Sequence, residues 1–120
     1  MKGYVDVFAL PVPKKNLAAY RRMATVFGKA VAKAGALEYR EFIGDDLKHA
    51  GVIAEFPSTI KLKAGEVLIF SVVEYRTKAH RNQVNKAIMK DPGMQKMMKM
   101  KPIFDVKRLL YGGFKTVVKM

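Results

Sequence analysis

The stretch that decides the fold is EVLIFSVVEY, residues 66–75. In a strand, successive side chains point to opposite faces. One face would then carry Val67, Ile69, Ser71, Val73 and Tyr75, and the other Leu68, Phe70 and Val72. A strand that is apolar on both faces belongs in the interior of a sheet whose two faces are covered. The chain offers two convincing helices, enough for one face, so we expect a second copy of the chain to cover the other.

The chain before this stretch predicts a strand, a helix and a second strand. Residues Tyr4–Leu10 alternate as a strand does, and Pro11 and Pro13 are expected to end it. Asn16 is a plausible N-cap for a helix whose apolar residues recur every three or four positions until Gly35. Such a glycine is typical of a helix C-terminus. The second strand is predicted at residues 37–43.

A long connection precedes the central strand. No regular element is expected from residue 47 to residue 65, but the segment is too apolar for a free linker. Its apolar residues are Val52, Ile53, Phe56, Ile60 and Leu62. We therefore expect an ordered flap that covers another part of the molecule.

The chain after the central strand predicts a second helix, a short helical element and a last strand. Thr77 can cap the second helix, and Asp91-Pro92 can begin the short one. The last strand is expected at about residues 107–118, kinked or bulged at Gly112-Gly113. The resulting βαββαβ order predicts one α+β domain over residues 1–120, with a ferredoxin-like antiparallel sheet and both helices on one face.

Charge is distributed unevenly. The chain has 23 Lys and Arg against 10 Asp and Glu, a net charge of +13. Residues 1–76 carry +4 of this and residues 77–120 carry +9. A positive field of this kind attracts nucleic acid, anionic lipid or an acidic partner, or it serves only solubility.

Composition excludes several classes of protein. There is no cysteine, so disulfides, thiol catalysis and a cysteine-based zinc site are absent. No stretch approaches the roughly 20 apolar residues of a membrane span, and the first residues lack a signal-peptide pattern. We therefore expect a soluble cytoplasmic protein.

Six motifs, in order, resemble a known family. They are Tyr4-Val5-Asp6, residues 11–16 (PVPKKN), residues 35–41 (GALEYRE), residues 61–66 (KLKAGE), Ala79-His80-Arg81 and residues 111–114 (YGGF). Together they are similar to the YbaA-like bacterial family of unknown function, within the dimeric α+β barrel superfamily. The resemblance implies a homodimer in which two sheets enclose a barrel. It implies no activity, because the superfamily includes cofactor-independent monooxygenases, haem enzymes, isomerases and plain ligand binders.

His80 is the foremost candidate for chemistry. It lies on the inner stripe of its predicted helix, just after the central strand, where it could act as an acid, a base or a ligand. The alternative is a buried imidazole bonded to the backbone or to an acid. Arg76 precedes the helix and joins the candidate ligand-binding residues. His49, in the flap, is a weaker candidate.

A second candidate cluster lies on the second strand. Alternation places Tyr39 and Glu41 on one face and Arg40 on the other, so only one of these sets can line a pocket. Asp6 and Arg108 could meet across the sheet as an ion pair, or Arg108 could bind an anion. The residues from Met89 to Lys101 include five methionines and four lysines, a composition suited to covering a pocket or packing on the barrel end.

Other kinds of site have little support in the sequence. Two histidines without a helical His-x-x-x-His spacing do not predict a metal site, and a lone histidine does not predict haem. No phosphate-binding glycine loop or hydrolase serine motif is present. We expect no metal and no cofactor.

Two classes of function follow. The first is a homodimer that binds a small, partly apolar molecule between sheet and helices, with Tyr39, Glu41, Arg76 and His80 as polar contacts. A cofactor-independent monooxygenase or isomerase would use the same pocket. The second class is an RNA-binding protein that uses the basic C-terminal third, where aromatic residues are few.

Overall fold

The computed structural model describes residues 2–49, 51 and 53–120; Val52, expected among the apolar residues of the flap, lies outside them. In the described chain the strands form one antiparallel sheet in the order β2-β3-β1-β4. Their bounds are Tyr4–Pro13 (β1), Glu38–Ile43 (β2), Glu66–Tyr75 (β3) and Leu110–Lys115 (β4). Strand β3 is therefore an interior strand, as its two apolar faces predicted.

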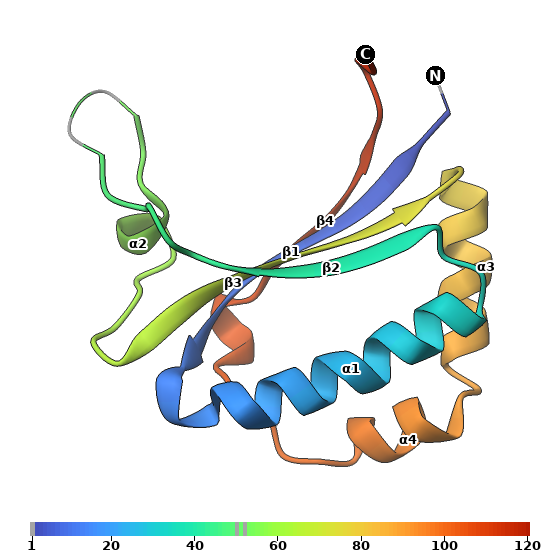
Figure 1. Cartoon of the computed structure of the whole chain (residues 1–120), viewed down its shortest axis with the longest axis horizontal. Helices are drawn as coiled ribbons and strands as arrows, with labels where there is room; N and C mark the ends of the chain where they lie inside the picture. The colour runs from blue at the N-terminus through green and yellow to red at the C-terminus, as the bar shows by residue number, and fades with distance from the viewer. Residues whose placement is uncertain (1, 50, 52) are drawn as a thin grey trace.

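Three helices lie on one side of this sheet (Figure 1): α1 (Leu17–Lys33), α3 (Lys78–Ile88) and α4 (Pro92–Met98). A one-turn helix, α2 (Phe56–Thr59), lies in the long connection at one end of the sheet. Short 3-10 turns precede α1 (η1, Lys14–Asn16) and β4 (η2, Val106–Arg108). The sequence prediction of a ferredoxin-like α+β fold is confirmed.

Helices α3 and α4 begin at the predicted capping residues, whereas the predicted cap of α1, Asn16, stands at the N-cap position but makes no side-chain cap hydrogen bond. The Thr77 hydroxyl accepts a hydrogen bond from the His80 backbone N–H at 3.0 Å, and the Asp91 carboxylate accepts one from Met94 N–H at 3.0 Å. Gly35, just after α1, has a φ of +106°, a left-handed conformation that glycine adopts without strain. These local bonds explain why the sequence located both α3 and α4.

The core lies between the sheet and the three helices. Val73 and Tyr75 of β3 are almost fully buried against Val31 of α1 and Val84 of α3. A second cluster forms where Leu10 and Ile69 meet α1, and it is closed by residues that precede β4. Burial of these side chains fixes which face of each strand turns toward the helices.

The two prolines do not end β1, contrary to the sequence prediction. Pro11 pairs with Leu68 and Pro13 with Glu66 of β3, whereas the pairing with β4 stops at Ala9. The Lys14 N–H donates to the Gly65 carbonyl, on the side of β1 that faces β3. Because N–H groups alternate in direction along a strand, the nitrogens of the two prolines point to the opposite side, where β4 no longer pairs with β1. Proline is tolerated where a ladder hydrogen bond is not required.

The last strand is shorter than predicted. Residues 107 and 108 lie in η2, and β4 covers only Leu110–Lys115. The expected bulge is absent, because Gly112 pairs with Val7 and Gly113 with Asp6 in an unbroken register. Gly113 has another use, since a Cβ there would lie 2.2 Å from the Tyr4 hydroxyl.

The long connection is the flap that its apolar residues predicted, although it also contains the α2 turn. Ile60 is 5% exposed and packs on Ala9 and Leu68 together with Leu62. Ala9 and Leu68 point away from α1, so the flap covers one end of the second face of the sheet.

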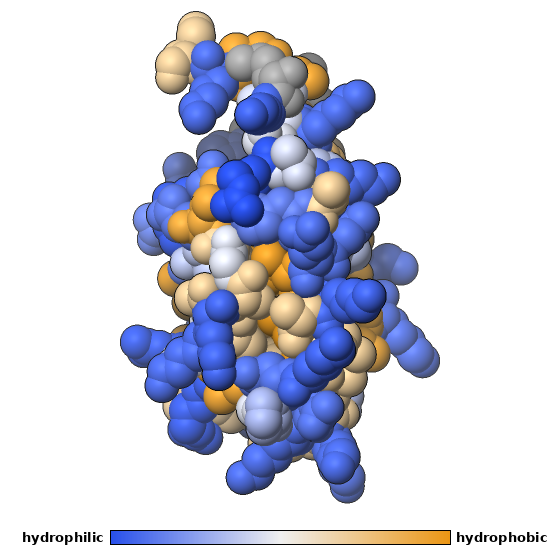
Figure 2. Space-filling view, turned by 90° about the vertical axis from the view of Figure 1, so that its right-hand side faces the viewer, coloured by the Kyte–Doolittle hydropathy of each residue, from blue (hydrophilic) through white to orange (hydrophobic). Residues whose placement is uncertain are grey.

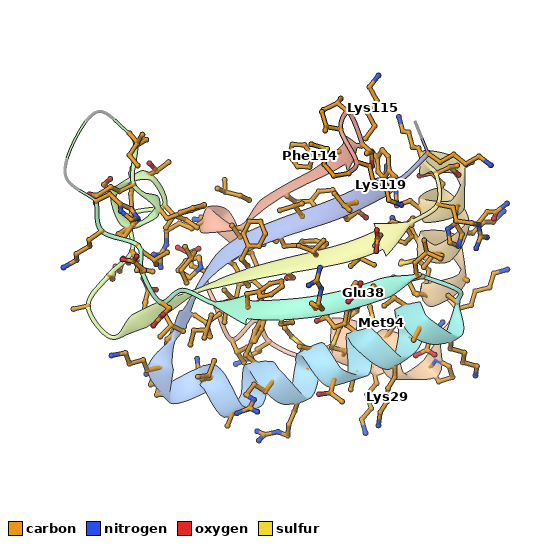
Figure 3. The ribbon with its side chains drawn as sticks, turned by 45° about the horizontal axis from the view of Figure 1, so that its top comes forward. Lys29, Glu38, Met94, Phe114, Lys115 and Lys119 are labelled. Atoms are coloured by element: carbon orange, nitrogen blue, oxygen red, sulfur yellow. The ribbon has the colours of Figure 1, made fainter. Side chains whose placement is uncertain are left out.

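The rest of that second face is uncovered. The molecule is 20 Å thick, about one helix layer plus one sheet layer. Figure 3 looks onto this face, with Phe114 on β4 and Glu38 on β2. Phe42, Leu110 and Phe114 are between 42% and 57% exposed on it. By contrast, the side of the molecule seen in Figure 2 is largely hydrophilic. We call the exposed sheet surface the open face.

Candidate ligand-binding site between helix α1 and the sheet

The polar cluster that sequence alternation predicted on β2 points toward the helices. Tyr39 pairs with Val73 and Glu41 with Ser71, residues on the helix-facing side of β3. Arg40 points to the open face, where its guanidinium lies 3.2 Å from Glu38 and 5.3 Å from the Phe42 ring centre. Only the pair Tyr39 and Glu41 can therefore contact a molecule held between sheet and helices.

The Glu41 carboxylate is held by two phenols. The Tyr20 hydroxyl of α1 donates to Oε1 at 2.7 Å, and the Tyr39 hydroxyl donates to Oε2. Burial, followed by the adjacent Glu41 carboxylate, raises the pKa of Tyr20 and of Tyr39 above the ordinary tyrosine value. Both phenols thus stay protonated and keep donating. Ser71, 3% exposed, places a further hydroxyl beside Tyr20.

Two adjoining hollows meet at this cluster. The outer one, of about 650 Å³, runs between α1 and the edge strand β2. The inner one, of about 170 Å³, lies between the sheet and the α4 segment. Tyr20, Ala24, Tyr39 and Glu41 line both. A polar group set in largely apolar walls is the usual form of a small-molecule site.

The outer hollow exists because α1 has small residues along one side. Ala24, Gly28 and Ala32 recur every four residues and line it. At Gly28 a Cβ would lie 2.8 Å from two ring carbons of Tyr39, so glycine lets that ring lie against the helix. This spacing of small residues was visible in the sequence and could have indicated the hollow.

The methionine-rich segment contributes to the inner hollow. Met97 of α4 and Phe104 after it are among its lining residues. Met94 is buried in the core, whereas Met98 is 55% exposed. The Asn16 side-chain amide donates to the Ile103 carbonyl at 2.8 Å and fixes the chain just after this segment to the start of α1. The segment therefore both packs on the body of the protein and closes the base of the hollow.

His80 lies elsewhere. Its Nδ1 accepts a hydrogen bond from the Arg76 backbone N–H at 3.0 Å, and its ring meets Tyr75 edge-on with centroids 5.8 Å apart. It is 7% exposed and does not line either hollow. The structure thus places His80 and Arg76 together and apart from Tyr39 and Glu41. His80 has the hydrogen bond to the backbone that the alternative interpretation, a buried imidazole, predicted. His49 is exposed in the flap, where its backbone N–H donates to Glu55.

The predicted ion pair between Asp6 and Arg108 is wrong. Asp6, 2% exposed, accepts instead from Arg81 at 2.7 Å, and Arg81 also donates to the Tyr111 hydroxyl. Arg108 donates to both carboxylate oxygens of Glu66 at 2.7 and 2.6 Å. Arg108 precedes β4 rather than lying on it, which carries it to the opposite end of β1.

Neither a metal site nor a membrane span is indicated in the described chain. Across residues 2–49, 51 and 53–120, no group of three or more His, Asp or Glu side chains converges as a metal site would require. Among the helices described, none has the length and apolar character needed to cross a bilayer.

Similar proteins are known from both sequence and structure. A protein from an uncultured marine organism, solved as a dimeric ferredoxin-like protein, superposes with a TM-score of 0.50 at 12% identity over 100% of this chain and 98% of its own. The uncharacterized protein YbaA of Escherichia coli K12 is 35% identical over 115 residues, 96% of this chain and 97% of its own. YbaA of Shigella flexneri matches equally. The family model "Protein of unknown function (DUF1428)" matches residues 3–106. The chain belongs to this DUF1428 family and is a relative of YbaA, which confirms the resemblance carried by the six sequence motifs.

Proposed function

We propose that this protein binds a small, partly apolar molecule in the two hollows between α1 and the sheet. The observation that carries the proposal is the convergence of Tyr20, Tyr39 and Glu41 at the junction of the hollows. A carboxylate with phenols fixed on both oxygens is already oriented, so a ligand would lose little free energy in ordering it.

A blocking variant tests this proposal. Ala24 lines both hollows, and Ala24→Phe would fill their junction without removing a polar group. Ala18→Phe, on the exposed side of the same helix, is the matched control. We expect the neutral fluorophore N-phenyl-1-naphthylamine to bind the wild type and Ala18→Phe, but not Ala24→Phe. Equal binding by all three proteins would place the fluorophore outside the hollows and contradict the proposal.

We further propose that the protein is a homodimer that packs through the open face. The support is its apolar surface: Phe42, Leu110 and Phe114 are exposed beside Val7 and Val72, where the flap does not reach. Two such sheets in face-to-face contact would bury apolar surface on both copies and complete the α+β barrel. Native mass spectrometry measures the subunit count and any retained small molecule together.

A second candidate is a cofactor-independent oxygenase or isomerase at the same site. The observation that favours it is the position of Glu41, a carboxylate at the edge of an apolar hollow, where a general base could take a proton from a bound molecule. Glu41→Gln keeps the shape of the side chain but cannot accept a proton as a carboxylate does. Retained binding with abolished turnover would identify an enzyme. His80→Ala, made in parallel, tests the sequence hypothesis that His80 takes part.

A further inference from the structure

Among the residues that the structure describes, Glu41 is the only charged one shared by the two hollows, and no cationic side chain there pairs with it. The ion pairs among the described residues involve other acids: Asp6, Glu38, Glu66 and Asp105. Two phenols donate to Glu41, but neither carries a positive charge. A carboxylate can accept about four hydrogen bonds. Glu41 is half-buried, and its remaining acceptor positions can take a hydrogen bond from a bound molecule.

The surroundings of Glu41 suit a cationic donor. The Tyr20 and Tyr39 rings stand next to the carboxylate and line both hollows. The faces of aromatic rings attract an ammonium group. An amine bound here would gain a charge-assisted hydrogen bond, which is stronger than a neutral one.

The mouth of the outer hollow is positively charged, opposite in sign to Glu41. Arg21 and Lys29, exposed on α1 two turns apart, line it on either side of Thr25. The rest of the wall of this hollow is mainly apolar, with Leu17, Ala24 and Ile69 among its residues. A molecule that carried only a positive charge would meet Arg21 and Lys29 unfavourably. A molecule with an anionic outer end would be held there.

We propose that the ligand is an amphoteric small molecule, with a protonated amine toward Glu41, an apolar body along α1, and a carboxylate or similar anion at Arg21 and Lys29. This inference rests on the proposed function, because it assigns a ligand class to the same hollows. The order of charges, negative within and positive at the mouth, sets the direction in which the molecule lies.

Four probes with one apolar body test the order of charges. They are 4-(aminomethyl)benzoate (amphoteric), 4-methylbenzylamine (amine only), 4-methylbenzoate (anion only) and 4-methylbenzyl alcohol (neutral). Affinities come from amide chemical-shift titrations of the labelled protein and from displacement of N-phenyl-1-naphthylamine. We expect the amphoteric probe to bind most tightly and the amine next, with shifts at Tyr39 and Glu41.

Variants identify which residue binds each charged group of the probes. Glu41→Gln should weaken the two amine probes about ten- to hundredfold, the usual effect of losing a charge-assisted hydrogen bond, and leave the alcohol unchanged. The double variant Arg21→Gln/Lys29→Gln should weaken the amphoteric probe to the level of the amine alone. Glu41→Gln preserves the size of the side chain, and Arg21 and Lys29 are both exposed, so the fold should persist.

The outcomes separate this inference from the proposed function. If the fluorophore binds in the hollow but the alcohol displaces it as well as the amines do, or none of the four probes displaces it, the amphoteric ligand is overturned while the hollow stays a binding site. The same holds if Glu41→Gln leaves the amine affinities unchanged. If the fluorophore binds equally to wild type and Ala24→Phe, the proposed function itself fails.

Discussion

Replacing Gly28 with alanine has two opposing effects on the stability of the fold, and the structure allows their sizes to be compared. Gly28 lies inside α1, where alanine is favoured over glycine by about 0.8–1 kcal/mol. The new Cβ, however, would lie 2.8 Å from Cδ2 and Cε2 of Tyr39. Favourable carbon contacts are about 3.5–4.0 Å, so the ring would have to retreat by about 1 Å.

The Tyr39 ring has little freedom to retreat. It packs edge-on against Phe27, with centroids 5.3 Å apart, and its hydroxyl donates to Glu41. Overpacking of this kind costs about 1–3 kcal/mol, more than the gain in helix propensity. We therefore expect Gly28→Ala to lower the free energy of unfolding by about 1 kcal/mol and to weaken ligand binding, because a displaced ring cannot hold the carboxylate.

A double-mutant cycle isolates the contact. In a Tyr39→Ala background the obstruction is gone, so the same Gly28→Ala change should raise the free energy of unfolding by about 1 kcal/mol. Urea unfolding followed by circular dichroism gives the values, at one protomer concentration because assembly shifts apparent stability. Stabilisation of about 1 kcal/mol in both backgrounds would refute the contact between residue 28 and the Tyr39 ring, and with it this wall of the hollow.

Three further predictions concern the assembly, a buried ion pair and the tyrosines. Phe114→Asp should convert the proposed dimer to a monomer in analytical ultracentrifugation; an unchanged dimer would place the interface elsewhere. Arg81→Met should destabilise the protein by about 3–5 kcal/mol, because it leaves the Asp6 carboxylate buried without its partner, and adding Asp6→Asn should recover part of the loss; equal stability of all variants would contradict this. The pKa values of four of the five tyrosines, Tyr20 and Tyr39 among them, are raised in the folded protein. These four phenols therefore contribute fully to stability below their unfolded pKa of about 10, and the contribution is lost as pH rises through their folded pKa values. Alkaline titration should therefore show the absorbance of these four tyrosinates rising together with loss of circular dichroism; ionisation of more than one tyrosine per chain at about pH 10 in an intact fold would count against it.

The fold was predictable because its strongest signals are local. Two-residue alternation identified β3 and the helix-facing side of β2, and Thr77 and Asp91 marked the starts of α3 and α4. The role of Pro11 was not predictable in this way. It depends on where β4 stops along β1, and that is a property of a strand about 100 residues later in the chain.

The site was only half predictable for a similar reason. Alternation assigns Tyr39 and Glu41 to a face, but it does not reveal that Tyr20, on the other side of the hollow, bonds the same carboxylate. Asp6 and Arg81 are likewise 75 residues apart and meet only in the folded protein. For His80, helical spacing predicted the burial correctly, but spacing does not distinguish a side chain that faces a cavity from one bonded to its own backbone.

The edge strand β2 serves two surfaces with alternate residues. Tyr39 and Glu41 face the hollow, while Arg40 and Phe42 face the open surface, and among the described strands β2 pairs with β3 alone. If a ligand fixes one side of this six-residue strand and a second copy fixes the other, each limits the same fraying motion. Binding and assembly would then be thermodynamically linked: ligand would tighten the dimer, and dimerisation would raise ligand affinity by the same factor.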